Sequence, residues 1–146
     1  HISGYFEAHR PEYYRRLQAV RERGEIEEWI QFFCAAVEDA ATRSSTRIRT
    51  LLDLRERYRQ EARNERSSLP VLIDTIFRNP VITVTTIMAA GDLSQPGASK
   101  LIHRAEARGW ISSVGRWGRG GKERWLASEV WAAVTNGADF TEKEVP

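Results

Sequence analysis

The sequence is poor in the residues that build covalent and metal centres. It contains one cysteine, one methionine and three histidines among 146 residues. A single cysteine excludes an internal disulfide, and no histidine has a cysteine or a carboxylate at metal-ligand spacing on a shared face. We therefore expect this chain to hold no metal and no cofactor.

Long hydrophobic runs are missing as well. No apolar stretch approaches the ~20 residues that a membrane-spanning helix needs. Residues 1–10 are polar and lack the features of a signal peptide. These observations predict a cytoplasmic protein with no membrane partner.

Recognisable catalytic motifs are also absent. The stretch GRWGRGGK at 115–122 has glycines and a lysine, but it lacks the GxxxxGK[ST] pattern of a phosphate-binding loop and does not lie between a strand and a helix. Cys34 lies within an apolar helical segment, which predicts a buried thiol and not a nucleophile. We therefore expect no enzymatic activity of this chain.

Helical periodicity dominates the first 66 residues. A helix is expected to begin near Pro11 and to end at Gly24, because proline suits a first helical turn and glycine suits a helix end. From residue 25 to about residue 64, apolar residues recur every three or four positions with no proline or glycine between them. One unbroken helix here would have ~40 residues and a length of ~60 Å.

The first half of this long helix is rich in large apolar side chains, and the second half is rich in charge. We expect the large side chains to form a core with those of the preceding helix; they are Trp29, Ile30, Phe33 and Val37 on one side and Tyr13, Tyr14, Leu17 and Val20 on the other. The charged end, RERYRQEARNER, is expected to be a solvated helix that leads to a linker at Ser67–Ser68.

Residues 81–125 are organised differently. Two short helices are predicted, separated by a tight turn at Gly91–Asp92. The second helix has an apolar stripe at the spacing i, i+3, i+4, i+7 and stops at Gly109. The stripe consists of Ala98, Leu101, Ile102 and Ala105.

A β-hairpin is expected next. Residues 110–114 and 123–126 are short β-type segments on either side of the glycine-rich and arginine-rich loop 115–122. A short amphipathic helix at 69–78 precedes the helix pair, and another helix is expected from Ser128. A helix-turn-helix followed by a β-hairpin is the winged-helix pattern.

These elements predict a mainly α fold. A helical segment with one long helix is followed by a winged helix-turn-helix domain that carries a small β-hairpin. We expect the helical segment at residues 1–66, the winged helix at 67–136 and a tail at 137–146.

The net charge of +2 does not by itself indicate a nucleic-acid ligand, but its distribution is uneven. Seven basic residues and only two acidic ones, Glu106 and Glu123, lie between residues 95 and 126. The second helix of a winged helix enters the major groove of DNA and the hairpin tip contacts the backbone. The predicted DNA-binding residues are Gln95, Ser99, Lys100, His103, Arg104, Arg116, Arg119 and Lys122.

A pattern of aromatic, arginine and glycine positions runs through the N-terminal part of the chain: Tyr5, Arg10, Glu12, Tyr13, Tyr14, Leu17, Val20, Arg21, Gly24, Trp29, Ile30, Phe32 and Phe33. In this pattern the chain resembles the C-terminal portion of Fic-family proteins. The resemblance covers nearly all of residues 2–135 and is specific in the first forty.

The resemblance implies a catalytic core N-terminal to this segment, in a parent protein that transfers AMP to protein hydroxyl groups with ATP and a divalent metal. The Fic active-site motif, HPFxxGNGRxxR, is absent from this sequence, so no catalytic residue of the family can be assigned to it. We therefore expect the chain to be a non-catalytic C-terminal fragment, with the Fic core of its parent as one partner.

Two functional hypotheses remain open. In the first, the winged helix binds double-stranded DNA and so targets or regulates the parent. In the second, the chain is a protein-interaction or dimerisation module without nucleic-acid binding, and the long helix pairs with a second copy. The face of the second helix discriminates between them, because DNA binding requires Lys100, Arg104 and Arg119 to be exposed together.

Overall fold

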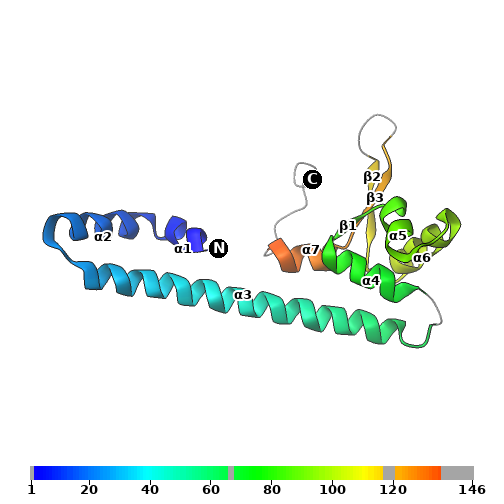
Figure 1. Ribbon diagram of the computed structural model, residues 1–146, viewed down its shortest axis with the longest axis horizontal. Coiled ribbons are helices and arrows are strands. Elements are labelled where there is room, and N and C mark those ends of the chain that lie inside the picture. Colours follow the sequence, from blue (N-terminus) through cyan, green and yellow to red (C-terminus); the bar gives the residue numbers. More distant parts are fainter. Residues whose placement is uncertain (1, 66–67, 117–120, 136–146) are drawn as a thin grey trace. The chain divides into compact units, whose positions relative to one another are not determined.

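The computed structural model of the chain describes residues 2–65, 68–116 and 121–135 (Figure 1). These residues form a mainly helical structure with a small three-stranded antiparallel sheet. The chain divides into two compact units, His1–Ile48 and Arg49–Pro146, which we call unit 1 and unit 2. The helical class and the hairpin expected from the sequence are confirmed.

Unit 1 contains α1 (Ile2–Ala8), α2 (Arg10–Arg23) and the first part of α3 (Ile26–Ala62). Pro11 lies in the first turn of α2, and Gly24 ends that helix with a φ of 70°, a left-handed conformation that glycine adopts without a steric penalty. Both boundaries agree with the sequence prediction. The unbroken helix α3 is also confirmed, with 37 residues.

Aromatic rings join α1 and α2 to α3 in unit 1. The Phe6 ring lies 5.8 Å from that of Phe32 and 6.5 Å from that of Trp29, and the Tyr13 ring lies 5.5 Å from that of Trp29. The side chains of Phe32 and Ala36 are buried by this packing. The core of unit 1 is therefore the single face of α3 that these aromatic rings cover.

The sequence prediction of a larger aromatic core is wrong for several residues. Ile30, Phe33 and Val37 are exposed on α3, and Tyr14 is exposed on α2. Cys34 is exposed too, so the expected buried thiol is not observed. The reason is geometric: α1 and α2 cover the face of α3 that bears Phe32 and Ala36, and the other residues lie elsewhere on the helix circumference.

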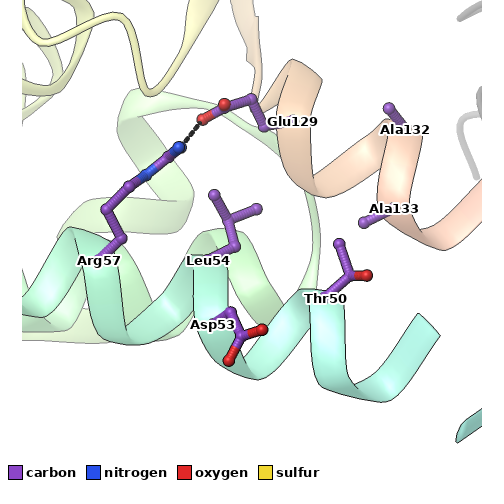
Figure 2. A pocket seen from close by; sticks show the side chains of 7 residues that line it. All are labelled: Thr50, Asp53, Leu54, Arg57, Glu129, Ala132 and Ala133. Carbon is purple, nitrogen blue, oxygen red and sulfur yellow. Dashed lines mark hydrogen bonds and ion pairs between the residues drawn. The ribbon is translucent and has the colours of Figure 1, made fainter. Parts of the chain in front are cut away.

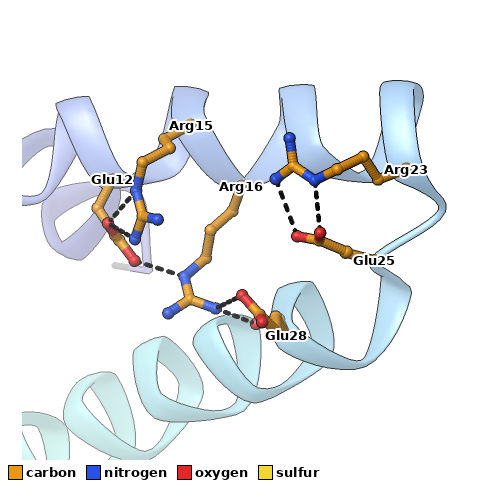
Figure 3. A network of polar contacts seen from close by, with 6 residues as sticks. All are labelled: Glu12, Arg15, Arg16, Arg23, Glu25 and Glu28. Atoms are coloured by element: carbon orange, nitrogen blue, oxygen red, sulfur yellow. Dashed lines mark hydrogen bonds and ion pairs between the residues drawn. The ribbon is translucent and has the colours of Figure 1, made fainter.

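A network of charged side chains ties α2 to the start of α3 (Figure 3). Glu12 accepts hydrogen bonds from Arg15 and Arg16, and both hold the pKa of its carboxyl below the ordinary value. Arg16 also donates from Nη1 to the backbone oxygen of Glu28 at 2.8 Å. This arginine therefore links the two helices in addition to the aromatic contacts.

Unit 2 contains the end of α3 and all later elements. These are α4 (Leu69–Arg78), β1 (Val81–Ile82), α5 (Val84–Gly91), α6 (Gln95–Ala107), β2 (Ser112–Arg116), β3 (Glu123–Leu126) and α7 (Ser128–Thr135). The strand order in the sheet is β1-β3-β2, with both pairs antiparallel. Strands β2 and β3 were expected from the sequence, whereas β1, a two-residue strand that pairs Val81 with Leu126, was not.

The last turns of α3 belong to the core of unit 2. Leu54, Tyr58 and Ala62 are buried in one cluster with α4, α6 and the sheet, and the Tyr58 ring stacks on Trp110 at 4.7 Å. The expectation of a solvated end of α3, with a boundary at residues 66–67, is wrong for Tyr58 and Ala62, which are buried. The compact units divide within α3 because these apolar side chains pack against the elements that follow.

Candidate nucleic-acid interface

Local caps fix the start of α5 and the turn between α5 and α6. Thr83 and Thr86 form a capping box at the start of α5, with Thr83 N donating to Thr86 Oγ1 at 2.6 Å. Asp92 ends α5 with a φ of 48°, and Ser94 Oγ accepts from the backbone N–H of Gly97 at the start of α6. These local bonds set the angle at which α6 leaves the turn.

Helix α6 divides into a buried stripe and an opposite exposed face. The predicted stripe is confirmed, since Ala98, Leu101, Ile102 and Ala105 are all buried. Lys100 and His103 are exposed on the opposite side, and Ser99 is half-buried beside them. His103 is 72% exposed, with Nδ1 3.6 Å from Glu106 Oε2. The expectation that no histidine shares a helix face with a carboxylate is therefore wrong for His103, because residues three apart on a helix are neighbours. The exposed face therefore presents a lysine, a histidine and a hydroxyl to solvent.

A groove lies between α5, the start of α6 and the hairpin. Its volume is about 530 Å³. Gln95 contributes from the first residue of α6, and Arg116 and Lys122 contribute from the hairpin. The remaining lining residues are Val84, Thr85, Met88, Gly121, Glu123 and Trp125.

Lys122 ties the hairpin to α5 across this groove. Its Nζ donates to Thr85 Oγ1 at 3.1 Å, while both side chains stay exposed. Arg116 is exposed at the end of β2. Glu123, the acid of the groove, accepts a hydrogen bond from Ser113 Oγ at 3.0 Å. Arg116 and Lys122 thus line the groove together with Glu123, whose carboxylate accepts one hydrogen bond.

Two basic residues at the C-terminal end of α6 have an internal partner. Arg108 forms an ion pair with Glu65, and Arg104 Nη1 lies 3.5 Å from the other oxygen of the same carboxylate. Arg108 also donates to the backbone oxygen of Arg104 at 3.1 Å and lies over the Trp110 ring. The structure therefore places Arg104 on α6 as predicted, but engaged with Glu65 and half-buried.

The predicted site residues fall into three groups. Lys100, His103 and Ser99 share the exposed face of α6, and Gln95, Arg116 and Lys122 share the groove. Arg104 follows Lys100 by four residues on α6; its side chain is 42% exposed and its Nη1 lies 3.5 Å from Glu65. Arg119 lies outside the described residues.

Two residues of this region were not found from the sequence. Thr85 lines the groove, and its only signal was its place in the first turn after the Thr83 cap. Glu65 had no signal, because its contacts with Arg104 and Arg108 join positions far apart in the sequence.

A second pocket, of about 630 Å³, lies between the end of α3 and α7 (Figure 2). Arg57 pairs with Glu129 at its rim, and Tyr58 donates its hydroxyl to the same carboxylate at 2.7 Å. Burial and this hydrogen bond raise the pKa of Tyr58, whereas Arg57 lowers the pKa of Glu129. The Tyr58 phenol is neutral and the Glu129 carboxylate is paired, so these residues join α3 to α7 and have a structural role.

Metal ligands do not cluster in the part of the chain that the structure describes: no group of three or more histidine, cysteine or acidic side chains lies close enough to hold an ion. Among the same residues, none of the helices combines the length and the apolar character needed to cross a bilayer.

Comparisons with known proteins give little further information. No family model matches the chain, and no curated protein matches it. Among solved structures, the chain is similar to AbfR in a disulfide-bonded form, with 13% sequence identity over 82% of this chain and 86% of that chain and a TM-score of 0.41. A likeness at this level assigns neither a family nor a function.

Proposed function

We propose that unit 2 is a winged helix-turn-helix domain that binds double-stranded DNA, with the exposed face of α6 in the major groove and the hairpin on the adjacent backbone. The observation that carries this proposal is the exposure of cationic side chains on both α6 and the hairpin. Lys100 extends from the free face of α6, and Lys122 and Arg116 extend from the groove beside the start of that helix.

The order and packing of the elements support this proposal. A short helix, α4, packs on the pair α5 and α6, and a tight capped turn joins the two. The hairpin β2–β3 follows directly, and β1 adds an edge strand to it. Since the apolar stripe of α6 is fully used in the core, the opposite face is available to a ligand.

The polar groups of this surface suit a duplex. Lysine and arginine neutralise phosphates, whereas Gln95, Ser99 and His103 carry donors and acceptors that reach base edges or phosphates. Within the described residues, the acids of the surface are engaged: Glu106 lies near His103, and Glu123 accepts from Ser113. Phosphate contacts would supply most of the affinity, and the α6 face would supply sequence preference.

The test is binding of a fluorescein-labelled duplex of about 25 base pairs, followed by anisotropy at one low salt concentration. The variant Lys100→Gln with Lys122→Gln removes two charges from the proposed surface. The control, Arg55→Gln with Arg59→Gln, removes two charges that pair with Asp74 on α4. We expect the first variant to bind at least about tenfold more weakly than the control. Equal affinity of the two variants would contradict the proposal.

We also propose that this DNA-binding unit serves a cytoplasmic Fic-like protein, as the sequence resemblance in unit 1 implies. In this proposal the chain itself transfers no nucleotide, and ATP with a divalent metal would be used only by a catalytic core. The coding sequence upstream of His1 tests it directly. An HPFxxGNGR motif there would support the family, and an unrelated domain would contradict it.

A further inference from the structure

The groove between α5, the start of α6 and the hairpin combines apolar and cationic side chains. Val84 and Met88 contribute from α5 and Trp125 from β3, and all three pack against the core of unit 2. Arg116 and Lys122 contribute exposed cations from the hairpin. The volume of about 530 Å³ is typical of small-molecule sites, which are lined mainly by apolar groups with a few polar ones. This lining suits a small ligand with an apolar body and a negative charge.

The indole of Trp125 gives an independent indication of a ligand. This side chain is 5% exposed, and its Nε1 is buried without a hydrogen-bond partner in the part of the chain that the structure describes. An indole N–H can only donate, and buried donors in folded proteins nearly always have an acceptor. The indole of Trp110, which is also buried, donates to Glu61 Oε2 at 2.7 Å. Trp125 therefore has a donor to offer, and it lines the groove.

The charged groups of the groove favour an anion. Lys122 donates to the Thr85 hydroxyl, which uses one of the three donors of its ammonium group. Arg116 carries a planar guanidinium, which can bind a carboxylate through two parallel hydrogen bonds. Glu123 also lines the groove, and its carboxylate accepts from Ser113. Because the two cations outnumber this acid, the groove attracts a negatively charged ligand.

We propose that this groove binds an aromatic monocarboxylate. The carboxylate of the ligand pairs with Arg116 and Lys122. Its ring packs on Val84 and Met88, since a thioether sulfur is a favourable neighbour of an aromatic ring. An oxygen of the ligand accepts the hydrogen bond that Trp125 Nε1 has to offer. The groove is thus a small-molecule site in addition to a part of the DNA surface.

The consequence for DNA binding rests on the proposed function, which assigns Arg116 and Lys122 to phosphates. A bound carboxylate occupies the same two cations, so the acid and the duplex compete and the acid releases the DNA. Lys100 is exposed on α6 and does not line the groove. In this proposal Lys100 serves DNA alone, whereas the two hairpin cations serve both ligands.

Binding of 2-naphthoate to the whole chain tests the site without DNA. Two-dimensional proton–nitrogen NMR of the labelled protein gives one indole cross-peak for each of the five tryptophans, and through-bond experiments assign that of Trp125. We expect this peak to move and to saturate with a dissociation constant on the order of 1 mM or below. 2-Naphthamide, which has the same shape and no charge, should bind at least about tenfold more weakly. Equal binding of the two compounds, or a Trp125 peak that does not move, overturns the proposal.

Two matched variants separate this site from the rest of the DNA surface. Lys122→Gln should weaken naphthoate binding by at least about threefold, whereas Lys100→Gln makes the same change outside the groove and should leave it unchanged. Equal affinity of the two variants for naphthoate overturns the site. In a second measurement, saturating naphthoate should release the fluorescein-labelled duplex from the original chain, and a duplex that stays bound overturns the competition. If naphthoate binds as described but the chain binds no DNA, only the proposed function is contradicted.

Discussion

Glu65 forms an ion pair with Arg108 and thereby joins the segment after α3 to the C-terminal end of α6. The carboxylate also lies 3.5 Å from Arg104, the next basic residue along the same side of α6. One carboxylate therefore lies beside two arginines of the predicted DNA-binding region. This internal anion lowers the number of cationic side chains that the proposed DNA surface offers.

The first prediction concerns this internal anion. Glu65→Gln should increase the affinity for duplex DNA several-fold, because Arg104 and Arg108 become available to phosphates. It should also lower the free energy of unfolding by about 1 kcal/mol through loss of a partly buried pair. Fluorescence anisotropy and urea denaturation measure the two effects. The matched control is Glu56→Gln, which makes the same change in net charge at a residue that contacts Gln60. An equal increase in DNA affinity in both variants would show that only the net charge matters, and would contradict the role of Glu65.

The second prediction concerns Tyr58, which is fully buried and donates its hydroxyl to Glu129. Tyr58→Phe keeps the stacking on Trp110 but removes this hydrogen bond, so we expect a loss of about 1–2 kcal/mol in urea denaturation. Tyr14→Phe is the control, because Tyr14 is 56% exposed and should change stability by less than about 0.5 kcal/mol. If Tyr58→Phe leaves the free energy of unfolding unchanged, the hydrogen bond to Glu129 contributes nothing to stability.

The third prediction concerns the turn before α6. A Cβ at Gly91 would lie 3.0 Å from Leu93 Cδ1 and 3.2 Å from Val71 Cγ1. Gly91→Ala should therefore destabilise unit 2 by about 1–3 kcal/mol. Gly4→Ala, in α1 with nothing within 4 Å of the added atom, should be neutral or stabilising by up to about 1 kcal/mol. Thermal melts should show a lower Tm for Gly91→Ala and an unchanged or higher Tm for Gly4→Ala; an unchanged Tm for Gly91→Ala would contradict the prediction.

The fourth prediction concerns acid pH. The hydrogen bond from Arg57, followed by that from Tyr58, lowers the pKa of Glu129 below 4.5 in the folded chain. A carboxylate with a depressed folded pKa stabilises the fold above its unfolded pKa, and this contribution is lost as the pH falls through the folded pKa. Because the side chain is half exposed, solvent screening limits the effect to on the order of 0.5 kcal/mol. Urea denaturation between about pH 3 and pH 6 gives the free energy of unfolding at each pH. This free energy should change less with pH for Glu129→Gln than for the original chain, and an identical pH dependence would contradict the prediction.

The element order was largely predictable from the sequence, because it depends on local signals. Pro11 and Gly24 mark the ends of α2, and the spacing of Leu101 and Ile102 in their stripe identifies the buried face of α6. The two-residue strand β1 was not predictable, since so short a segment has no detectable alternation. Its pairing is imposed by β3.

The sequence could not predict which side chains are exposed or which residues far apart in the chain pair with one another. Periodicity identifies Phe33 and Cys34 as residues of an apolar helix, but not which face α1 and α2 cover. Likewise, the sequence does not distinguish Lys100 from Arg104, because each contributes one positive charge to α6. The structure separates them, because Glu65 lies within reach of Arg104, whereas Lys100 is on the exposed face of α6.

The salt dependence of DNA binding tests the proposed function most directly. The logarithm of the binding constant is measured against the logarithm of the salt concentration for the original chain and for Lys100→Gln with Lys122→Gln. If Lys100, Arg116 and Lys122 each neutralise a phosphate, the slope for the original chain should be about −2.7 or steeper, and the variant should lose about 1.8 of it. Absence of binding at low salt, or the same slope in both proteins, would contradict the assignment of this surface to DNA.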